Sequence, residues 1–472
     1  MDSFPHPARL SQGLVNIPGS TPQGATLVAK LLYKDFHEHH CFFNDAFFHD
    51  HLAHHLLSMY DLGASEEAIQ HMNDFEVKMQ RNLLHGKTET ERIERKAGAI
   101  NEENWKDTLG EKNARLYADY LEFFAQRIAI NGVPRTLTKY LFSPEANGNG
   151  VMMLARFFGG IVHPIIQAAF GIEFGQNHMV AQALALTALT SPEGAVVMEP
   201  SGLPEIITTA SGVTSTSLLS LLREFYDHPN ITNMPFPGLP GPGVTFAKLV
   251  DWVNGNPSNG STIRDIISKW TFDLASSTDI ESKLDEALWQ CALLVGGITP
   301  AGKQPRMDFL VMHLLTSALG LRPIISLLET PLQKAQLLVT HARSSLLVLL
   351  LRGTPKLDCS VVMKLPSVPK HVIPGASVWF PLIANANLHT EVHVVKAIRA
   401  LVYAAQRLGN TEAGGMPGAV DAAGKETHPG AKNVDGTVFI RIAAVLTNQL
   451  GWVSHGDAEK PWDFRGFWAE SG

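Results

Sequence analysis

The stretch FHDHLAHHLLSMYDLGA, residues 48–64, decides the fold class, because its apolar residues recur at the spacing of a helix. Steps of four and three residues place five side chains in one stripe: Phe48, Leu52, His55, Met59 and Leu62. The pattern predicts a helix within residues 46–62. Histidine is not a strong helix former, so the histidines crowded into the first half of this stretch point to a chemical role.

Helical spacing also dominates the rest of the 472-residue chain, and no alternation of strands and helices indicates a parallel sheet. We therefore expect a mainly α fold: one large helical-bundle-like domain over residues 1–472, which could consist of two lobes. Helices are predicted at residues 24–34, 46–62, 66–84, 113–130, 151–157, 164–170, 177–190, 214–226, 245–253, 283–295, 306–320, 331–351, 390–407 and 436–449.

Three segments depart from the helical pattern. KLDCSVVMKL, residues 356–365, alternates most like a strand, so a few minor strands are expected. Residues 228–243 are rich in proline and glycine and should form a loop. Residues 408–436 are rich in glycine and poor in bulky apolar side chains, which predicts a long loop, either a mobile surface loop or a lid over a site.

Composition and charge limit the possible partners and location. The net charge is -7, and no basic run indicates a nucleic-acid surface. The most apolar run, residues 344–351, is too short to span a bilayer, and the N-terminus lacks the features of a signal peptide. The three cysteines are far apart, which is typical of a reducing compartment. We expect a cytoplasmic protein that binds neither nucleic acid nor membrane.

The familiar nucleotide and hydrolase motifs are incomplete. Gly297-x4-Gly302-Lys303 resembles a phosphate-binding loop, but Gln304 stands where a magnesium-binding Ser or Thr is needed. Residues 147–154 contain the first two glycines of a dinucleotide fingerprint but have Met153 at the third position. GxSxG does not occur. The sequence thus predicts no dedicated flavin or nicotinamide domain.

Histidines stand on several apolar segments. His55 lies inside the stripe of the opening stretch, His51 lies one turn before it, and His54 faces another side, better suited to contact substrate or solvent. A single histidine of this kind is more commonly a hydrogen-bonded core residue than a ligand. However, His313 lies in RMDFLVMHLLTSALGL, residues 306–321, which is apolar nearly all round.

A further histidine stands at a predicted helix entry. In GGIVHPIIQAAFGIEF, residues 159–174, His163 precedes a proline, which favours the first turn of a helix. Gln167 follows one turn later, and Glu173 is a rare acid in an apolar segment. These two side chains could position substrate hydroxyls or transfer a proton.

The segment LHTEVHVVKAIRAL, residues 388–401, gathers polar groups at helical spacing. On a helix, His389, His393 and Lys396 would share one face, with Arg399 within a turn of Lys396. A helix with an ordinary solvated face is the alternative. Single histidines on several buried helices are what a metal site inside a helical bundle needs, and a site without thiolates fits iron and oxygen chemistry best.

Four of these motifs together resemble the questin oxidase-like family across nearly the whole chain: FHDHLAHHLLSMYDLGA, HPIIQAAFGIEF, MDFLVMHLLTS and EVHVVKAIRAL. The resemblance implies an enzyme of fungal aromatic polyketide pathways that opens the central ring of an anthraquinone such as questin to give a benzophenone. It also implies that the functional residues include His55 and its neighbours, His163, His313, and the pair His393 and Lys396. Gln167 departs from the family pattern, where a histidine is common; if this position contacts the substrate, the resemblance implies a different preferred aromatic compound.

Residues and resemblance together favour a dioxygenase with non-heme Fe²⁺ held by His55, His163, His313 and His393, with His51 in reserve. The substrate would be a small aromatic polyketide together with O2, oriented by Gln167, His54 or His389 in an apolar pocket, with Glu173 as a candidate acid or base. An alternative is a Baeyer–Villiger-type monooxygenase, NADPH-dependent or cofactor-independent, that uses the histidines for acid–base catalysis. A non-catalytic protein that binds aromatic compounds is the third interpretation.

Lys396 carries the most specific expectation. A protonated lysine has no lone pair and would be repelled by a metal ion, whereas a buried lysine can lose its proton. A neutral lysine reacts with carbon dioxide to form a carbamate, which is an oxygen ligand with a negative charge. We therefore expect a carboxylated Lys396 that completes the iron site and serves catalysis, with Arg399 steadying the charge.

Overall fold

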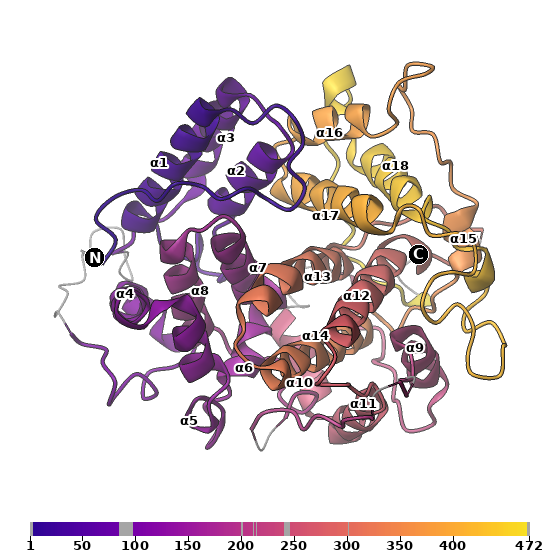
Figure 1. Ribbon diagram of the computed structural model, residues 1–472, viewed down its shortest axis with the longest axis horizontal. Coiled ribbons are helices and arrows are strands. Elements are labelled where there is room, and N and C mark those ends of the chain that lie inside the picture. The colour runs from indigo at the N-terminus through magenta and orange to yellow at the C-terminus, as the bar shows by residue number, and fades with distance from the viewer. Residues whose placement is uncertain are drawn as a thin grey trace. The chain divides into compact units, whose positions relative to one another are not determined.

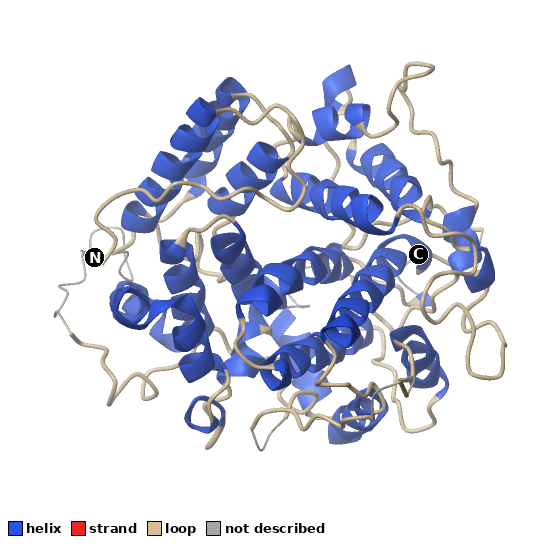
Figure 2. Cartoon of the chain, viewed as in Figure 1, coloured by secondary structure: helices blue, strands red, loops and turns tan. Residues whose placement is uncertain are grey.

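The computed structural model describes residues 3–84, 98–199, 202–210, 212–213, 215–239, 246–300 and 302–469. These residues form helices joined by loops, and they contain isolated β-bridges but no strand (Figure 2). The expected mainly α fold is confirmed, whereas the expected minor strands are not found in this part of the chain. The α-helices are α1 Pro22–Glu38, α2 Leu52–Asp61, α3 Glu66–Glu76, α4 Tyr117–Leu141, α5 Pro144–Asn147, α6 Met153–Phe157, α7 Gly159–Glu173, α8 Asn177–Leu189, α9 Leu218–Asp227, α10 Phe246–Asn254, α11 Pro257–Ser268, α12 Ser277–Gly297, α13 Phe309–Leu327, α14 Pro331–Leu351, α15 Cys359–Met363, α16 Phe380–Ala386, α17 Val392–Leu408 and α18 Val438–Leu450.

The chain divides into two compact units: unit 1 comprises residues 1–193 and 320–329, and unit 2 comprises residues 194–319 and 330–472. In unit 1, α4 and α7 pack against α8, and α1, α2 and α3 lie side by side (Figure 1). In unit 2, α17 packs on α18, and α12 contacts α14, α15 and α18. The expectation of one domain with two lobes stays a prediction.

The predicted strand at residues 356–365 was wrong, because this segment contains the short helix α15. Asp358 caps the helix: its side chain accepts a hydrogen bond from the backbone N–H of Ser360. Cys359 and Val362, three residues apart, are both buried, which is the spacing of one helical face. The helix has only five residues, which is too few to show the 3.6-residue period, so its apolar residues resembled the alternation of a strand.

The long segment at residues 408–436 is a loop, as predicted, but its own contacts anchor it. Val420 and Glu426 form a β-bridge, and the Thr427 hydroxyl donates to the Gly418 carbonyl at 2.6 Å. Met416 and His428 are each 2% exposed, so the loop contributes side chains to the core of unit 2. The described part of the other predicted loop, residues 228–239, contains neither helix nor strand, and residues 240–243 lie outside the described residues.

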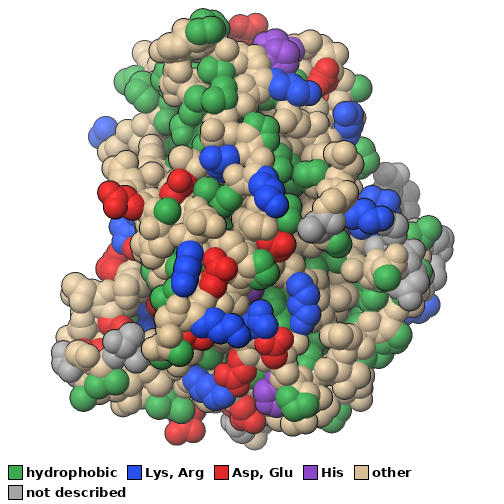
Figure 3. Space-filling model, turned by 90° about the vertical axis from the view of Figure 1, so that its right-hand side faces the viewer, with side chains coloured by type: hydrophobic (Ala, Val, Ile, Leu, Met, Phe, Trp, Pro, Cys, Tyr) green, Lys and Arg blue, Asp and Glu red, His purple; other side chains and the backbone are tan. Residues whose placement is uncertain are grey.

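Among the described residues, one helix, α13, is long and apolar enough to cross a membrane. Of its 18-residue window, 83% is buried inside the structure, and a core helix passes the same test. On the face drawn in Figure 3, basic and acidic side chains are interspersed and no single sign of charge dominates. This mixture agrees with the absence of basic runs in the sequence.

Candidate active site

In the histidine-rich stretch, helix α2 begins later than the sequence predicts. The helix begins at Leu52, whose backbone N–H donates to Asp50 Oδ1 at 2.8 Å, so the carboxyl group of Asp50 satisfies an N–H group at the start of the helix. His51 is the N-cap residue, and His49 forms a β-bridge with Phe42. His49 and His51 therefore do not lie on the helix, contrary to the predicted helix over residues 46–62. The β-bridge of His49 and the N-cap position of His51 hold these residues in non-helical conformations.

His55 is held by a carboxylate in the core of unit 1. Its ring is fully buried, and Nδ1 lies 2.9 Å from Oε1 of Glu76 on α3, which is itself 5% exposed. An Nδ1–H that donates to this carboxylate leaves the lone pair of the neutral ring on Nε2. Nε2 is buried and has no hydrogen-bond partner in the described part of the chain.

His163 is held by a backbone carbonyl. Its Nδ1 lies 2.5 Å from the oxygen of Gly160, which again places the lone pair on Nε2. That Nε2 lies 2.7 Å from Nε2 of His51, and the ring of His49 stacks on His163 with centroids 4.1 Å apart. The structure thus brings His51 and His163 into contact and adds His49, which the sequence did not single out.

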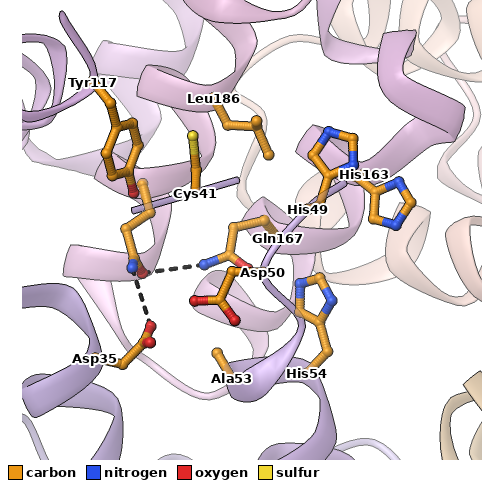
Figure 4. Close-up of a pocket in the computed structure, with 11 residues that line it drawn as sticks. Asp35, Cys41, His49, Asp50, Ala53, His54, Tyr117, His163, Gln167 and Leu186 are labelled. Carbon is orange, nitrogen blue, oxygen red and sulfur yellow. Dashed lines mark hydrogen bonds between the residues drawn. The ribbon is translucent and has the colours of Figure 1, made fainter. Parts of the chain in front are cut away.

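Gln167 and His54 line a small cavity in unit 1 (Figure 4). Its volume of about 20 Å³ is room for about one water molecule, so it holds no aromatic ring as it stands. The ring of His54 stacks on Phe170 with centroids 5.0 Å apart. The residues that line the cavity are Asp35, Cys41, His49, Asp50, Ala53, His54, Tyr117, His163, Gln167, Gln182 and Leu186.

A chain of hydrogen bonds fixes the amide of Gln167. Its Nε2 donates to Oε1 of Gln182 at 3.1 Å, and Gln182 Nε2 donates to Asp35 Oδ2 at 3.3 Å, as the dashed lines in Figure 4 show. The other oxygen of Asp35 lies 2.8 Å from Nδ1 of His39. Since a carboxylate only accepts, the direction of the whole chain follows from Asp35.

Asp35 and Asp50 bring two carboxyl groups together beside the cavity. Burial, and then the charge and hydrogen bond of Asp35, raise the pKa of Asp50 well above its usual range. Two close carboxylates repel each other in a desolvated site, which favours the neutral form of Asp50. No local sequence pattern predicts this pair, because Asp35 lies on α1 and Asp50 lies before α2.

Glu173 lies at the end of α7, where its Oε1 accepts a hydrogen bond from the backbone N–H of Leu14 at 2.7 Å. The carboxylate therefore fastens the N-terminal segment to the helix. Glu173 is not among the residues that line the cavity. Its catalytic role stays a prediction.

In unit 2, His313 and His393 are close neighbours. Their ring centroids are 4.9 Å apart, and the ring of Phe309 stands 4.7 Å from each of them. His313 Nδ1 lies 2.7 Å from the Phe309 carbonyl oxygen, one turn earlier on α13. The side chains of His313 and His393 are both buried.

The other ring, His393, is held by a carboxylate. Its Nδ1 lies 2.6 Å from Oε1 of Glu391, the N-cap residue of α17, and Trp462 Nε1 donates to the other oxygen. Burial alone would raise the pKa of Glu391, but His393 and Trp462 outweigh it and lower the pKa to about 2. Glu391 is therefore a carboxylate at neutral pH and fixes Nδ1–H on His393.

Lys396 lies one turn after His393 on α17 and is only 2% exposed, and Arg399 is equally buried. The helix begins at Val392, so His389 precedes it and does not share the expected helical face. His389 Nε2 lies 3.3 Å from the Leu450 carbonyl oxygen, and its Nδ1 accepts from the Glu391 backbone N–H at 3.2 Å. Its role in substrate binding stays a prediction.

Glu76 and Glu391 are the functional candidates that sequence reasoning missed. Glu391 stands two residues before His393, and this acid at a helix entry beside a histidine could have been noticed. Glu76 is 21 residues from His55 and belongs to another helix, so no local pattern connects them.

Comparison with known proteins relates the chain to oxidases and to one protein family. Relatives covering most of the chain carry the names of oxidases. The questin oxidase of Aspergillus terreus is 28% identical over 392 residues, and the alignment covers 80% of each chain. The questin oxidase of Aspergillus fumigatus is 28% identical over 400 residues, and the alignment covers 82% of this chain and 83% of the relative. A Baeyer–Villiger oxidase of Paecilomyces divaricatus is 26% identical over 392 residues, covering 82% of this chain and 80% of its own. Residues 48–401 match the family described as questin oxidase-like, and the chain belongs to this family.

Proposed function

We propose that this protein is an oxygenase that cleaves the central ring of a hydroxylated anthraquinone, or of its reduced form, to give a benzophenone. The oxygen would come from O2 activated at a non-heme iron. Membership of the questin oxidase-like family supports the reaction class, since relatives are named questin oxidase and Baeyer–Villiger oxidase. The iron ligands in this proposal are His55, His163, His313 and His393.

One observation carries the iron proposal: all four histidines are buried, and each has Nδ1 within hydrogen-bond distance of a carboxylate or a backbone carbonyl. Ligating histidines in metalloproteins are held in this way, because the second nitrogen fixes the tautomer and orients the ring. These contacts support each of the four histidines separately as a ligand. His51, whose Nε2 lies 2.7 Å from Nε2 of His163, remains the reserve ligand.

The chemistry of the available donors supports iron rather than a thiolate-bound metal. The three cysteines are buried, and burial is the main cause that raises the pKa of each thiol. A buried thiol held in its protonated form is a poor metal ligand. Imidazole nitrogens with carboxylate-type oxygens suit Fe²⁺.

Lys396 would complete the donor set as a carbamate. The ammonium group would first lose one proton; the neutral amine would then attack carbon dioxide, forming an N–C bond and releasing a second proton, so that a cationic side chain becomes an extended carboxylate. Burial at 2% exposure favours the neutral amine that this reaction needs. The buried guanidinium of Arg399, one turn along α17, would offset the new negative charge.

Bound iron would supply activation of dioxygen or of a bound hydroxyquinol. The residues of the chain would exclude water and orient the aromatic compound. In this proposal Gln167 and His54 contact a hydroxyl group or a water molecule beside the small cavity, Glu173 transfers a proton, and His389 contacts substrate. Glu76 and Glu391 keep the rings of His55 and His393 in place.

The second candidate is a Baeyer–Villiger-type monooxygenase, NADPH-dependent or cofactor-independent, that uses the same histidines as acids and bases. The name of the Paecilomyces divaricatus relative favours it. In that mechanism the contacts of Glu76 and Glu391 would tune proton affinity rather than metal binding.

Metal analysis and oxygen labelling separate the candidates. The protein is purified without a histidine tag, its iron content is measured, and hydroxylated anthraquinones and their reduced forms are tested under ¹⁸O2. Near-stoichiometric iron, with ¹⁸O in a benzophenone product, supports the first candidate. Turnover that persists after complete metal removal, with or without NADPH, would replace it with the second. The absence of turnover with every quinone and hydroquinone would leave a non-catalytic binding protein.

A further inference from the structure

Three consecutive residues before His163 adopt the left-handed conformation. Their φ and ψ angles are 55° and 40° at Gly160, 52° and 49° at Ile161, and 58° and 21° at Val162. Residues with a branched Cβ almost never adopt this conformation, because Cβ comes too close to the following carbonyl. Such strain persists only where the surroundings impose it, and it concentrates at functional sites.

The left-handed turn determines how His163 is held. It brings the Gly160 carbonyl oxygen to 2.5 Å from Nδ1 of His163, just before right-handed helix resumes. The turn also fits tightly against a neighbouring ring, since a Cβ on Gly160 would lie 2.8 Å from the imidazole of His49. Glycine at this position therefore satisfies both the positive φ and the close approach.

The segment after α8 holds the turn from the other side. A Cβ on Gly159 would lie 2.5 Å from the Ser191 carbonyl oxygen, so the two backbones are in contact. The buried Arg156 anchors this segment by donating from Nη1 to the Thr190 carbonyl at 2.7 Å. The strained turn is thus pressed against a segment that is itself fixed.

Glu193 ends this segment and reaches the turn. Its Oε2 accepts a hydrogen bond from the backbone N–H of Ile161 at 3.5 Å, and the backbone N–H groups of Ile161 and Gly160 both act to lower the pKa of this carboxyl group. Successive N–H groups of a turn form a concavity that suits a carboxyl group.

We infer that Glu193 is a positioning residue for His163: its carboxyl group clamps the N–H groups of Gly160 and Ile161 and so keeps the Gly160 carbonyl against Nδ1. The inference deepens the proposed function, because it explains how one proposed ligand is oriented. The ring orientation itself can be measured in metal-free protein.

The choice of variants follows from the chemistry of the clamp. Burial, together with the charge of Glu111, raises the pKa of Glu193 to about 8, so a neutral carboxyl group is present at pH 7. Glu193→Gln keeps a neutral acceptor of the same length, whereas Glu193→Ala removes the acceptor and Glu193→Asp withdraws it by one methylene. Glu103→Ala, at an exposed position of the same unit, is the matched control.

The test is the tautomer of His163, observed by long-range ¹H–¹⁵N correlation in full-length, chelator-treated protein labelled with ¹⁵N-histidine. His163→Gln assigns the signals. We expect the Nδ1–H tautomer in the wild type, Glu193→Gln and Glu103→Ala, and mixed tautomers in Glu193→Ala and Glu193→Asp. An unchanged tautomer in whichever of the Ala and Asp variants folds, judged by circular dichroism, overturns the inference.

Cobalt(II) binding, measured by competition, distinguishes this inference from the proposed function. We expect Glu193→Ala to weaken binding at least about 10-fold, and Glu193→Gln to change it less than about 3-fold. A shifted tautomer with unchanged metal affinity would support the clamp but remove His163 from the ligand set. Weakened binding with an unshifted tautomer would overturn the clamp.

Discussion

The ring of His55 on α2 donates from Nδ1 to the carboxylate of Glu76 on α3 across 2.9 Å, and both side chains are buried. The same relationship recurs in unit 2 between His393 and Glu391, at 2.6 Å. A buried carboxylate that accepts from one ring nitrogen makes the other nitrogen a stronger donor to a metal ion. The two pairs therefore give each unit an imidazole prepared for ligation.

Glu76→Gln should weaken metal binding by about 10- to 100-fold, because an amide oxygen accepts less strongly than a carboxylate and lowers the basicity of His55 Nε2. The affinity is measured by competition with a chromophoric chelator. Glu67→Gln, on the exposed side of α3, is the control and should bind as the wild type does. Equal affinities for both variants would show that Glu76 has only a structural role.

Alanine at His55, His163, His313 or His393 should reduce bound iron and turnover together, because each removes one proposed ligand. His51→Ala should keep more iron than any of these four, since His51 is the reserve ligand. Iron content by plasma emission spectroscopy and activity are measured on the same samples. Full metal occupancy in all four variants would mean that the proposed ligand set is wrong.

The stability of the protein should fall as the pH drops from about 6.5 to 4, partly because of His341. Burial lowers the pKa of this residue on α14 from 6.5 to about 4. In that window the unfolded chain takes up a proton that the folded chain excludes, so the free energy of unfolding decreases with decreasing pH. For one proton the slope is about 1.4 kcal/mol per pH unit, and the whole window amounts to roughly 3 kcal/mol.

His341→Gln should remove that part of the slope, which urea unfolding at pH 4 to 7 would measure. Thr340→Val on the same helix is the control: Thr340 is buried and does not titrate, so its loss should shift the stability equally at every pH. A slope in His341→Gln as steep as in the wild type would contradict the assignment.

The fold class could be predicted because most helices are long enough to show their period. Each of the fourteen predicted segments overlaps a helix of the structure, including the long apolar α13 and α14, although predicted segments 46–62 and 66–84 extend beyond their helices. The short helices α5, α15 and α16 were missed, since four to seven residues complete too few turns to reveal a stripe. The longer α11 was also missed; it has proline, glycine and three serines in twelve residues, which resemble a loop.

The candidate site could be predicted only in part. His55 and His313 stood out because a polar ring interrupts an apolar surface. The groups that hold the rings, such as Glu76, come from distant helices and leave no local pattern. The left-handed turn before His163 is also invisible, because Ile161 and Val162 disfavour that conformation and only tertiary contacts impose it.

Lys396 is the most decisive position for the proposed function. It is 2% exposed on α17, one turn after His393, where a permanently charged ammonium group would oppose a metal ion held by that histidine. A carbamate reverses the charge and supplies an oxygen ligand. Lys396→Ala should therefore lose iron and activity together, whereas Lys364→Ala, at an exposed position of unit 2, should keep both and change stability by no more than about 0.5 kcal/mol.

Carbon dioxide provides the second arm of this test. Protein reconstituted with iron under ¹³CO2 should carry one ¹³C label in the wild type and none in Lys396→Ala. Short carboxylic acids, such as acetate or propionate, should restore part of the iron binding to Lys396→Ala, because they can place a carboxylate where the carbamate was. A wild-type protein that binds iron fully in rigorously CO2-free buffer, without label uptake, would show that the lysine acts as an amine.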